Sequence, residues 1–362
     1  MSVAALPRRT FLAAAAAASL GPATVSRARS TTARSNQPPI RIGQIGTGHA
    51  HASKLSVYRA SPDYEVVGIV EPDADLRRTA ERQATFQGLR WMTQEELLNQ
   101  PGLQAVLVET EVRHSLAAAA ACVNAGCHVH LDKPAGESLA DFKTLLENST
   151  AKGLLLQMGY MYRYNPGFRL LHQLLQDGWL GDVFEVHTVM SKLVSASDRR
   201  KLAEYPGGIF FEIGCHVLDQ VLKTLGPPRE VHAFPRTSAP AADALADNML
   251  AVLEYPNALA TVKSSAIEVD GTSRRQFTVC GTRGTLHLQP LDRPSAQLTL
   301  DSERGNWKVG TQTIQLPAYT RYVDDAADMV RIIRGEKKSD YSPEHDLAVQ
   351  STLLRACGLP AQ

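Results

Sequence analysis

The sequence predicts an α/β protein with two sheets. We expect an N-terminal, doubly wound parallel sheet and then a C-terminal α/β domain with a large, open, mostly antiparallel sheet. Short apolar strands alternate with helical segments between residues 40 and 160, whereas residues 248–288 contain two hairpin patterns. The chain of 362 residues is also long enough to bury two cores.

The first strand runs into the glycine turn Gly46-Thr47-Gly48-His49, and a helix is expected over residues 52–60. Such a turn gathers backbone N–H groups at a helix N-terminus, where they hold a pyrophosphate. Glycine suits it because a side chain would resist the required φ and keep the phosphate away. His51 stands where the dinucleotide fingerprint has its third glycine, so an ordinary strand-to-helix turn is the alternative.

A second buried strand, residues 64–71, ends on an acid. Glu71 lies 23 residues after Gly48, near the spacing at which a carboxylate binds the ribose hydroxyls of an adenosine. A carboxylate there would repel a 2′-phosphate, which favours NAD over NADP, although Arg77 and Arg78 follow closely. A solvated acid at a strand end is the alternative.

Two further strands, residues 103–110 and 127–134, flank a helix expected over residues 115–124, which Gly126 ends. In a doubly wound sheet the ligand crevice lies at the carboxyl ends of the strands. The polar residues at these ends are therefore candidate cofactor ligands: Gly46, Thr47, Gly48, His49, Glu71, Thr110 and Lys133.

A strand over residues 154–159 leads into Tyr160–Pro166, and apolar residues then recur at helical spacing from residue 209 to 225. Glu212 and His216 are four apart, so an α-helix would place them on one face, with Asp219 one turn further along. A carboxylate beside an imidazole raises its basicity, and alcohol oxidation needs a base. A pair on a helix surface is the alternative.

The remaining elements are expected to be structural. Residues 248–255 and 258–265 predict a hairpin closed by Pro256-Asn257, and residues 277–288 predict a second hairpin. Closing helices are expected over residues 322–334 and 345–357.

The N-terminus differs from the rest of the chain. Arg8-Arg9 precede an alanine-rich run, and a polar segment follows to about residue 37. Paired arginines before a mild apolar stretch are typical of a twin-arginine signal, which exports folded protein. We therefore expect a signal and linker over residues 1–37, with cleavage after Ala28, and a periplasmic or exported protein. A frayed N-terminal helix is the alternative.

Composition excludes several classes of partner. The chain has 38 basic and 37 acidic residues, but its first 40 residues hold five arginines and no acid. The remainder is therefore mildly acidic, which argues against nucleic acid. No apolar run after the leader is long enough for a membrane span. The five cysteines show neither disulfide nor zinc spacing, and no metal site is expected.

Several motifs together resemble the glucose–fructose oxidoreductase / inositol dehydrogenase (Gfo/Idh/MocA) family. They are the glycine turn, Asp132-Lys133-Pro134 at a strand end, Tyr162-Arg163-Tyr164-Asn165-Pro166, the Gly207-Gly208 pair followed by Glu212-x-x-x-His216, and the turn Gly281-Thr-x-Gly284. The resemblance extends from residue 40 to the C-terminus. It implies an NAD-binding Rossmann domain over residues 38–160 and a substrate and oligomerisation domain over residues 161–362.

The resemblance also implies the chemistry. An NAD(P)-dependent oxidoreductase would move hydride to or from a secondary alcohol of a sugar, cyclitol or sugar derivative. His216 would be the base, Lys133 the donor to the substrate oxygen and Glu212 the tuning carboxylate, while Arg163 and Asn165 would line the substrate cleft. The family implies a homo-oligomer formed through the C-terminal sheet. Asp132, Glu212 and Thr110-Glu111-Val112 depart from the usual motifs, which puts the nicotinamide-side contacts in doubt.

Two other functions stay open. Some exported relatives of this family resemble glycoside hydrolases that oxidise and re-reduce their substrate around a retained NAD. Tight retention of NAD would suit an exported oxidoreductase as well. A non-catalytic sugar-binding protein of the same fold is the second alternative. Substrate identity and oligomer size do not follow from the sequence.

Overall fold

The computed structural model describes residues 37–239 and 243–361. The expected signal, including Arg8, Arg9 and the cleavage position at Ala28, lies outside the described residues. Residues Pro39–Gln362 form one compact unit, to which all elements below belong.

The first sheet has six strands, all parallel, in the order β3-β2-β1-β4-β5-β6. The order reverses direction at β1, which confirms the doubly wound sheet and places the ligand crevice at the carboxyl end of β1. The strands are β1 (Ile40–Ile45), β2 (Tyr64–Val70), β3 (Trp91–Met92), β4 (Ala105–Val108), β5 (His128–Leu131) and β6 (Leu156–Met158).

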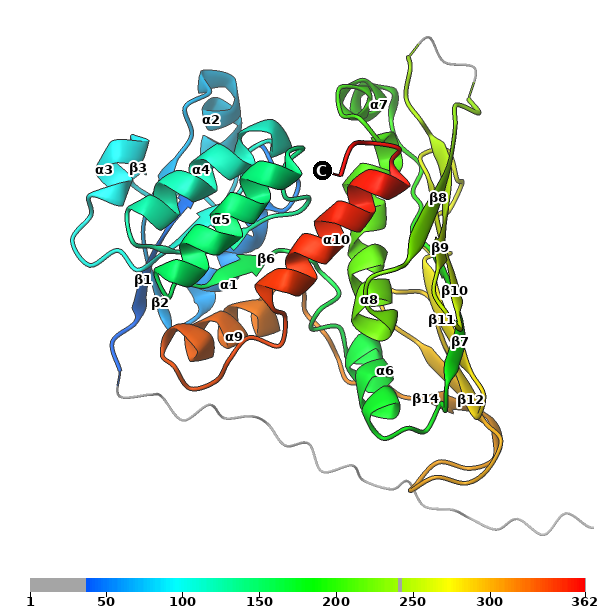
Figure 1. The fold of residues 1–362 in the computed structure, drawn as a ribbon. Coiled ribbons are helices and arrows are strands. Elements are labelled where there is room, and N and C mark those ends of the chain that lie inside the picture. The colour runs from blue at the N-terminus through cyan, green and yellow to red at the C-terminus, as the bar shows by residue number, and fades with distance from the viewer. Residues whose placement is uncertain (1–36, 240–242, 362) are drawn as a thin grey trace, which may run out of the picture. The chain divides into compact units, whose positions relative to one another are not determined.

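Helices cover this sheet (Figure 1). Local capping explains several of their starts: Asp73 caps α2, Thr93 and Glu96 form a capping box on α3, and Ser138 caps α5. The helices are η1 (Ala52–Lys54), α1 (Leu55–Ala60), α2 (Ala74–Glu81), α3 (Gln94–Leu98), α4 (Val112–Asn124), α5 (Leu139–Ala151) and, from the far end of the chain, α9 (Val323–Ile333). The Tyr64 hydroxyl donates to the carbonyl of Ala326 on α9 at 2.7 Å, which ties α9 to β2.

The second sheet has eight strands in the order β14-β13-β12-β11-β7-β10-β9-β8. Only β7 and β10 pair in parallel, so the expected mostly antiparallel sheet is confirmed. The strands are β7 (Val183–Val189), β8 (Glu230–Arg236), β9 (Asn248–Glu254), β10 (Leu259–Ser265), β11 (Gln276–Gly281), β12 (Gly284–Leu288), β13 (Ala296–Leu300) and β14 (Gly310–Ile314). Both expected hairpins, β9–β10 and β11–β12, are present.

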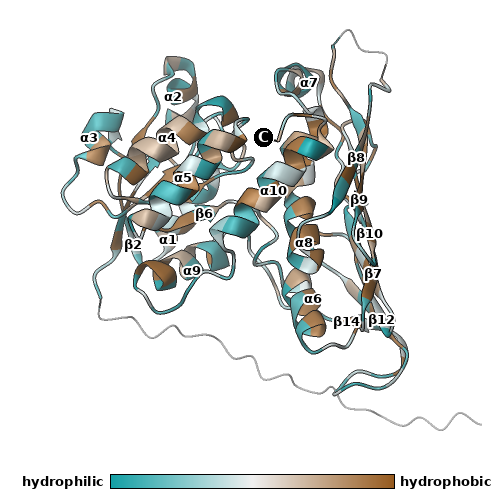
Figure 2. Cartoon of the chain, in the orientation of Figure 1, coloured by the Kyte–Doolittle hydropathy of each residue, from teal (hydrophilic) through white to brown (hydrophobic). Residues whose placement is uncertain are grey.

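Figure 1 shows helices along one face of this sheet. They are α6 (Pro166–Gln176), α7 (Ala196–Ala203), the π-helical turn η2 (Phe210–Gly214), α8 (Cys215–Leu225) and α10 (Pro343–Ala356). Along α6, Phe168, Leu171 and Leu174 recur every three residues and are all buried, and hydrophobic bands are visible on α6 and α8 in Figure 2.

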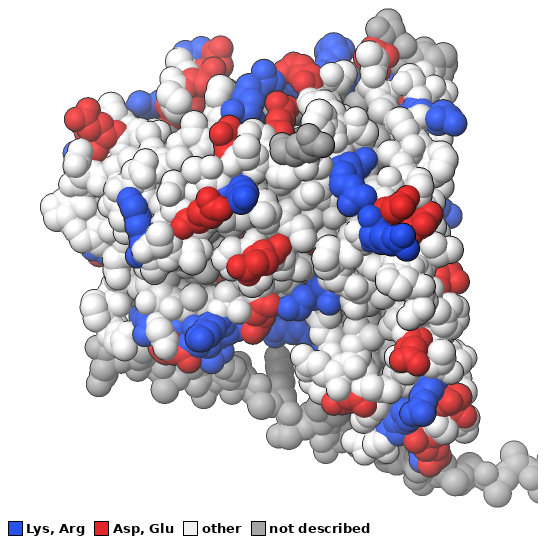
Figure 3. Space-filling model, viewed as in Figure 1, with Lys and Arg blue, Asp and Glu red and all other residues white. Residues whose placement is uncertain are grey.

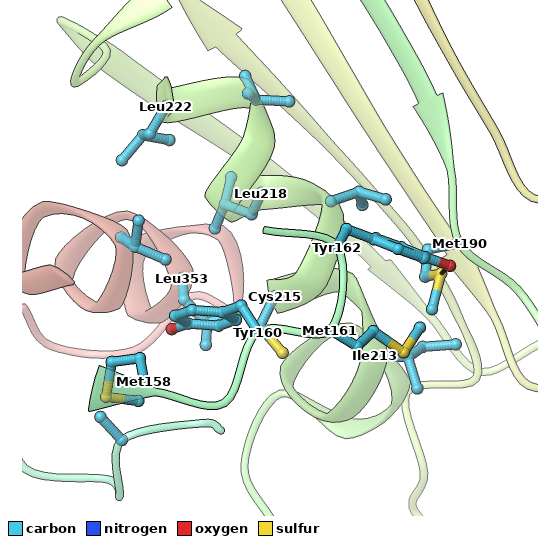
Figure 4. Close-up of a cluster of buried hydrophobic side chains, with 14 of the residues drawn as sticks. Met158, Tyr160, Met161, Tyr162, Met190, Ile213, Cys215, Leu218, Leu222 and Leu353 are labelled. Atoms are coloured by element: carbon cyan, nitrogen blue, oxygen red, sulfur yellow. Dashed lines mark hydrogen bonds between the residues drawn. The ribbon is translucent and has the colours of Figure 1, made fainter. Parts of the chain in front are cut away.

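The segment after β6 connects the two sheets. Tyr160 and Tyr162 point in opposite directions in Figure 4, toward Leu353 of α10 and toward Met190 beside the second sheet. Both tyrosines are fully buried, as is the neighbouring Cys215. The connection is thus part of the hydrophobic core, which fixes where α8 lies relative to the ends of the parallel strands.

The surface carries mixed charge. On the face seen in Figure 3, basic and acidic side chains are interspersed across the surface. Among the helices that the structure describes, none combines the length and the apolar character needed to cross a bilayer.

Gly46 is the tightest point of the glycine turn. Its φ is +94°, and a Cβ added there would lie 2.5 Å from the backbone nitrogen of Thr110 and 2.6 Å from the carbonyl carbon of Glu109. Both neighbours are backbone atoms at the end of β4, so they cannot move aside. Gly88 has a similar φ of +74° but nothing within 4 Å of an added Cβ.

We therefore predict that Gly46→Ala lowers the free energy of unfolding by about 2–5 kcal/mol, because a positive φ and a backbone clash add together. Gly88→Ala, the matched control, should cost only about 1–2 kcal/mol, from its positive φ alone. Urea-induced unfolding measures both. Equal losses in the two variants would show that the close approach of β4 to the turn is unimportant.

Candidate active site

A cavity of about 970 Å³ lies at the carboxyl ends of β1, β2 and β4. Gly46, Gly48, Glu71 and Thr110 line it, so four of the predicted cofactor ligands meet at one crevice. The positive φ of Gly46 brings the turn against β4, where a side chain would not fit. These features suit a dinucleotide, whose pyrophosphate needs a bare backbone turn.

Glu71 is held in place by the glycine turn. Its Oε2 accepts hydrogen bonds from the backbone nitrogen of Thr47 at 2.7 Å and from the Thr47 hydroxyl at 2.8 Å, and its Oε1 accepts from the nitrogen of Asp73 at 3.1 Å. Thr47 therefore orients Glu71 rather than lining the cavity itself. A carboxylate has about four acceptor positions and three are used here, so Oε1 of Glu71 retains capacity for one ribose hydroxyl.

The rest of the cavity lining has more acids than bases. The acidic residues are Glu71, Asp73, Asp75, Glu96 and Glu111, and the basic ones are Arg77 and Lys201, with His114. Arg77 lies over the Trp91 ring, 5.1 Å from its centroid, and pairs with Glu81 at 3.0 Å. A cation already engaged in this way offers less to a 2′-phosphate.

Lys133 lies just beyond the end of β5 and is buried. Its Nζ donates to the backbone carbonyl of Glu212 at 2.8 Å and to the Glu212 carboxylate at 3.3 Å. Burial opposes the charged form, but Glu212, Cys215 and Asp132 outweigh it and raise the pKa of Lys133. Burial also opposes ionisation of Glu212, yet Lys133 lowers the pKa of that carboxyl. The pair is therefore ammonium and carboxylate at neutral pH.

The helix that carries Glu212 begins with a π turn, which the sequence did not predict. The expectation of one continuous α-helix implied that Glu212 and His216 share a face. In a π turn the hydrogen bonds run from i to i+5, so residues four apart no longer align. Glu212 pairs with Lys133 instead of His216. The wider turn also presents the Glu212 carbonyl to Lys133.

The expected raised basicity of His216 is wrong. Burial, with Lys133 as the next cause, holds the pKa of His216 well below its usual value. His216 is 2% exposed, and its Nδ1 accepts a hydrogen bond from the backbone nitrogen of Met161 at 3.4 Å. The imidazole is thus neutral and held by the segment that joins the two sheets.

Arg163 was expected to line the substrate cleft, but the structure places it in a buried ionic network. Its guanidinium donates to Asp219 at 2.7 Å and contacts Asp346, and it lies 3.9 Å from the centroid of the Tyr341 ring. Burial would raise the pKa of Asp219, but Arg163 and His345 outweigh it and hold that pKa at about 2. These contacts join the segment after β6 to α8 and α10.

Asn165 is also committed to structure. It caps α6 by accepting a hydrogen bond from the nitrogen of Gly167 at 2.9 Å, and its amide donates to the Leu291 carbonyl at 2.9 Å. Only 1% of the residue is exposed. Arg163 and Asn165 are thus both buried and bound to protein partners.

His49 likewise does not line the cofactor cavity. Its Nε2 donates to the carbonyl of Lys133 at 3.0 Å, and its Nδ1 accepts from the backbone nitrogen of His51 at 3.2 Å. The side chain is therefore turned inward, where it supports the strand end that carries Lys133.

Sequence reasoning missed a buried polar network centred on Asp132. Lys54 contacts Asp132 and lies 3.0 Å from Glu109, and it donates to His130 at 2.9 Å. His51 Nδ1 lies 3.2 Å from the Asp132 carboxylate. A signal was present in the sequence, because His51 replaces a glycine and Lys54 lies one helical turn after it.

Ligand atoms of His49, His51 and Asp132 lie within 4.8 Å of one another, a spacing that a metal ion could use. However, the Lys54 ammonium contacts the same Asp132 carboxylate. A second cation beside a buried ammonium is unfavourable in a low-dielectric interior. We therefore interpret these residues as a hydrogen-bonded acid–base network.

Comparison with known families decides what the two-sheet architecture and its crevice represent. Residues 40–160 match the profile of an oxidoreductase family with an NAD-binding Rossmann fold, and residues 168–287 match the GFO/IDH/MocA C-terminal domain. The chain belongs to the Gfo/Idh/MocA family of oxidoreductases.

Individual proteins similar to this Gfo/Idh/MocA protein support the assignment to the family. An uncharacterized oxidoreductase of Schizosaccharomyces pombe is 27% identical over 77% of this chain and 78% of its own length. An inositol 2-dehydrogenase of Saccharopolyspora erythraea is 30% identical over 59% of this chain and 64% of its own. The crystal structure of GenD2 from gentamicin A biosynthesis, in complex with NAD, superposes with a TM-score of 0.73 at 22% identity, covering 89% of this chain and 95% of that one.

We predict that Arg163→Leu lowers the free energy of unfolding by about 3–5 kcal/mol, because it leaves Asp219 and Asp346 buried without their cation. Arg169→Leu is the control. Arg169 forms an exposed pair with Asp324 at 3.2 Å, and its loss should cost less than about 1 kcal/mol. Urea unfolding measures both. If Arg163→Leu were fully stable but had a raised KM for its substrate, Arg163 would be a substrate-binding residue after all.

Proposed function

We propose that this Gfo/Idh/MocA protein is an NAD-dependent oxidoreductase that moves hydride to or from a secondary alcohol of a sugar, cyclitol or sugar derivative. The observation that carries the proposal is the Lys133 ammonium, buried at the end of β5 and held at 2.8 Å by the Glu212 carbonyl. β5 is the neighbour of β4, and the carboxyl ends of β1, β2 and β4, with the glycine turn and Glu71, line the cavity.

The residues support this chemistry as follows. When bound, a nicotinamide cofactor supplies the hydride acceptor or donor. Lys133 donates to the substrate oxygen and stabilises the negative charge that develops there as the O–H bond breaks. Glu212 keeps Lys133 charged and limits its motion, while burial strengthens both interactions. An imidazole near Lys133 takes the hydroxyl proton.

The proposed substrate class rests on two supports. A relative with 30% identity is named an inositol 2-dehydrogenase, and cyclitols and sugars share the secondary alcohol that the lysine would polarise. Glu212, the partner of Lys133, remains 22% exposed at its side chain, so its carboxylate can accept a hydrogen bond from a further substrate hydroxyl.

Lys133→Met should lower kcat/KM about 100-fold or more on a proven substrate, because the donor to the substrate oxygen is lost. NAD affinity should change little. The control is Lys143→Met, whose ammonium is exposed on α5 and only 3.9 Å from Glu147. Steady-state kinetics measure both variants. If Lys133→Met kept full turnover, the proposed site would be ruled out.

NAD is the proposed cofactor in preference to NADP. Glu71 lies where the adenosine ribose would bind, and most charged residues of the cavity are acidic. Its carboxylate can accept a ribose hydroxyl and would repel a 2′-phosphate. Retention of NAD through turnover is part of the proposal, since export would separate the enzyme from the cytoplasmic nucleotide pool.

Glu71→Ser should weaken NAD binding about tenfold and strengthen NADP binding, so that the ratio of the two dissociation constants shifts by more than tenfold. Asp75→Ser is the control, because Asp75 also lines the cavity but is exposed and paired with Arg78. Calorimetric titration with each nucleotide measures the ratio. An equal shift in Asp75→Ser would assign the effect to overall charge rather than to Glu71.

Two further properties are proposed. The twin-arginine pattern at Arg8-Arg9 supports export to the periplasm, which cell fractionation tests. A homo-oligomer is supported by exposed apolar residues on the second sheet, Phe234 at 45% and Leu259 at 54%. They pair in register with Leu250 and Glu254, on the face away from the buried Ala251 and Leu253. Light scattering of the purified protein tests this proposal.

A further inference from the structure

His51 occupies an unusual place. It stands where the dinucleotide fingerprint has its third glycine, and its Nδ1 lies 3.2 Å from the carboxylate of Asp132, the residue before Lys133. The His51 ring is 5.7 Å from the His216 ring and 5.7 Å from the Tyr322 ring, centroid to centroid. Two imidazoles are therefore neighbours in the candidate active site, and only one of them belongs to the motif that the family resemblance identified.

The hydrogen bonds of Asp132 determine the tautomer of His51. The Asp132 Oδ1 accepts from the backbone nitrogen of Lys133 at 2.7 Å and lies 3.2 Å from His51 Nδ1, while Oδ2 contacts Lys54. Burial opposes ionisation of Asp132, but His49, Lys54 and His51 outweigh it and hold the pKa of the carboxyl well below its usual value. An ionised carboxylate only accepts, so His51 Nδ1 must carry the proton. Its Nε2 then has a free lone pair.

His216 has the opposite arrangement. The backbone nitrogen of Met161 is a donor, so His216 Nδ1 must be the acceptor. A neutral His216 then carries its proton on Nε2. Burial keeps it neutral, with Lys133 acting in the same direction on the pKa. His216 therefore offers a hydrogen-bond donor, and not an acceptor, at Nε2.

Exposure agrees with this division. The His51 side chain is 14% exposed, whereas His216 is 2% exposed. Burial lowers the pKa of both imidazoles, that of His51 to about 4 although Asp132 opposes the shift, so both are neutral at neutral pH and the partners of Nδ1 distinguish them. Once protonated, the imidazolium would be stabilised by the carboxylate of Asp132.

We propose that His51, oriented by Asp132, is the proton acceptor in alcohol oxidation, and that His216 is a hydrogen-bond donor to the same substrate oxygen. This rests on the proposed function. In the oxidation direction the hydroxyl O–H bond breaks and its proton moves to His51 Nε2. The carbon–hydrogen bond breaks as its hydride passes to the oxidised nicotinamide cofactor, and the carbon–oxygen bond becomes a carbonyl. Reduction runs in reverse, with His51 as the acid.

The two departures from the family motif support each other. His51 stands where the dinucleotide fingerprint has a glycine, and Asp132 is one of the departures from the usual motifs; these two residues contact one another. Lys54, one turn after His51, contacts the same carboxylate and lies 3.0 Å from Glu109. The ammonium balances the buried charge without occupying Nε2 of His51.

The first test reads the tautomers directly, without substrate or turnover. Long-range proton–nitrogen correlation spectra of protein with labelled histidines distinguish Nδ1–H from Nε2–H rings. The eleven histidines are assigned by comparing His51→Asn and His216→Gln with the unchanged protein. We expect a neutral Nδ1–H ring for His51 and a neutral Nε2–H ring for His216. The Nε2–H form at His51 would overturn the assignment.

The second test uses substitutions that keep one half of each ring. Asparagine at position 51 can still donate to Asp132 but lacks the group equivalent to Nε2. Glutamine at position 216 can still donate from the Nε2 position. We expect His51→Asn to lower kcat about 100-fold or more, with unchanged NAD affinity, and His216→Gln to lose less than about tenfold. His128→Asn is the control and should leave kcat unchanged, because His128 lies at the start of β5 and accepts a hydrogen bond from the nitrogen of Leu155.

Urea unfolding of each variant separates lost folding from lost chemistry, and exogenous imidazole should partly restore kcat in His51→Ala. The reverse order of losses would return the proton-acceptor role to His216. Failure of the unchanged protein to transfer hydride with any sugar or cyclitol would overturn the proposed function. The tautomer spectra would still decide whether His51 is arranged as a base.

Discussion

The buried carboxylate of Asp132 is the constraint on which the rest of the site depends. An ionised group removed from water is tolerated only with partners for its charge, and this one has Lys54, His51 and the backbone nitrogen of Lys133, with His49 Nδ1 3.5 Å from its Oδ2. Each partner is thereby placed. The carboxylate fixes the helix after the glycine turn through Lys54 and His51, and it fixes the strand end that carries Lys133.

Charge in this network is unevenly shared between two carboxylates. Burial and the nearby Asp132 raise the pKa of Glu109, whereas the surrounding cations lower the pKa of Asp132. Lys54 lies between the two and is fully enclosed. Negative charge is therefore concentrated on Asp132, the carboxylate that contacts His51. The network supplies a fixed anion at the back of an imidazole that remains neutral until it takes a proton.

Most of the fold was predictable because its signals are local. Alternating apolar strands and helices predicted the parallel sheet, and the glycine turn and Glu71 predicted the cavity at its carboxyl edge. The predictions that failed concerned residues whose partners are far away in the sequence. Arg163 was predicted to be a substrate ligand, but Asp219 of α8 and Asp346 of α10 contact it and bury it. These contacts cannot be predicted from local sequence patterns, because the three residues are far apart in the sequence.

The predicted pairing of Glu212 with His216 was wrong for a different reason. Spacing arguments assume 3.6 residues per turn, and a π turn inside an otherwise helical sequence breaks that assumption without any change in hydrophobic pattern. The hydrogen bonds of Lys133 reveal the π turn, since its ammonium donates to both the carbonyl and the carboxylate of Glu212. His216 is then left with the nitrogen of Met161 as its partner.

The role of a histidine is set by what bonds its Nδ1, not by the motif in which it stands. A carboxylate at Nδ1 fixes the proton there and leaves a base at Nε2, whereas a backbone N–H at Nδ1 leaves a donor at Nε2. His51 and His216 show the two cases 5.7 Å apart. Oxidising an alcohol needs a group that takes the proton, and holding its oxygen needs a group that donates. Two imidazoles of opposite tautomer supply both, with the Lys133 ammonium balancing the charge that develops between them.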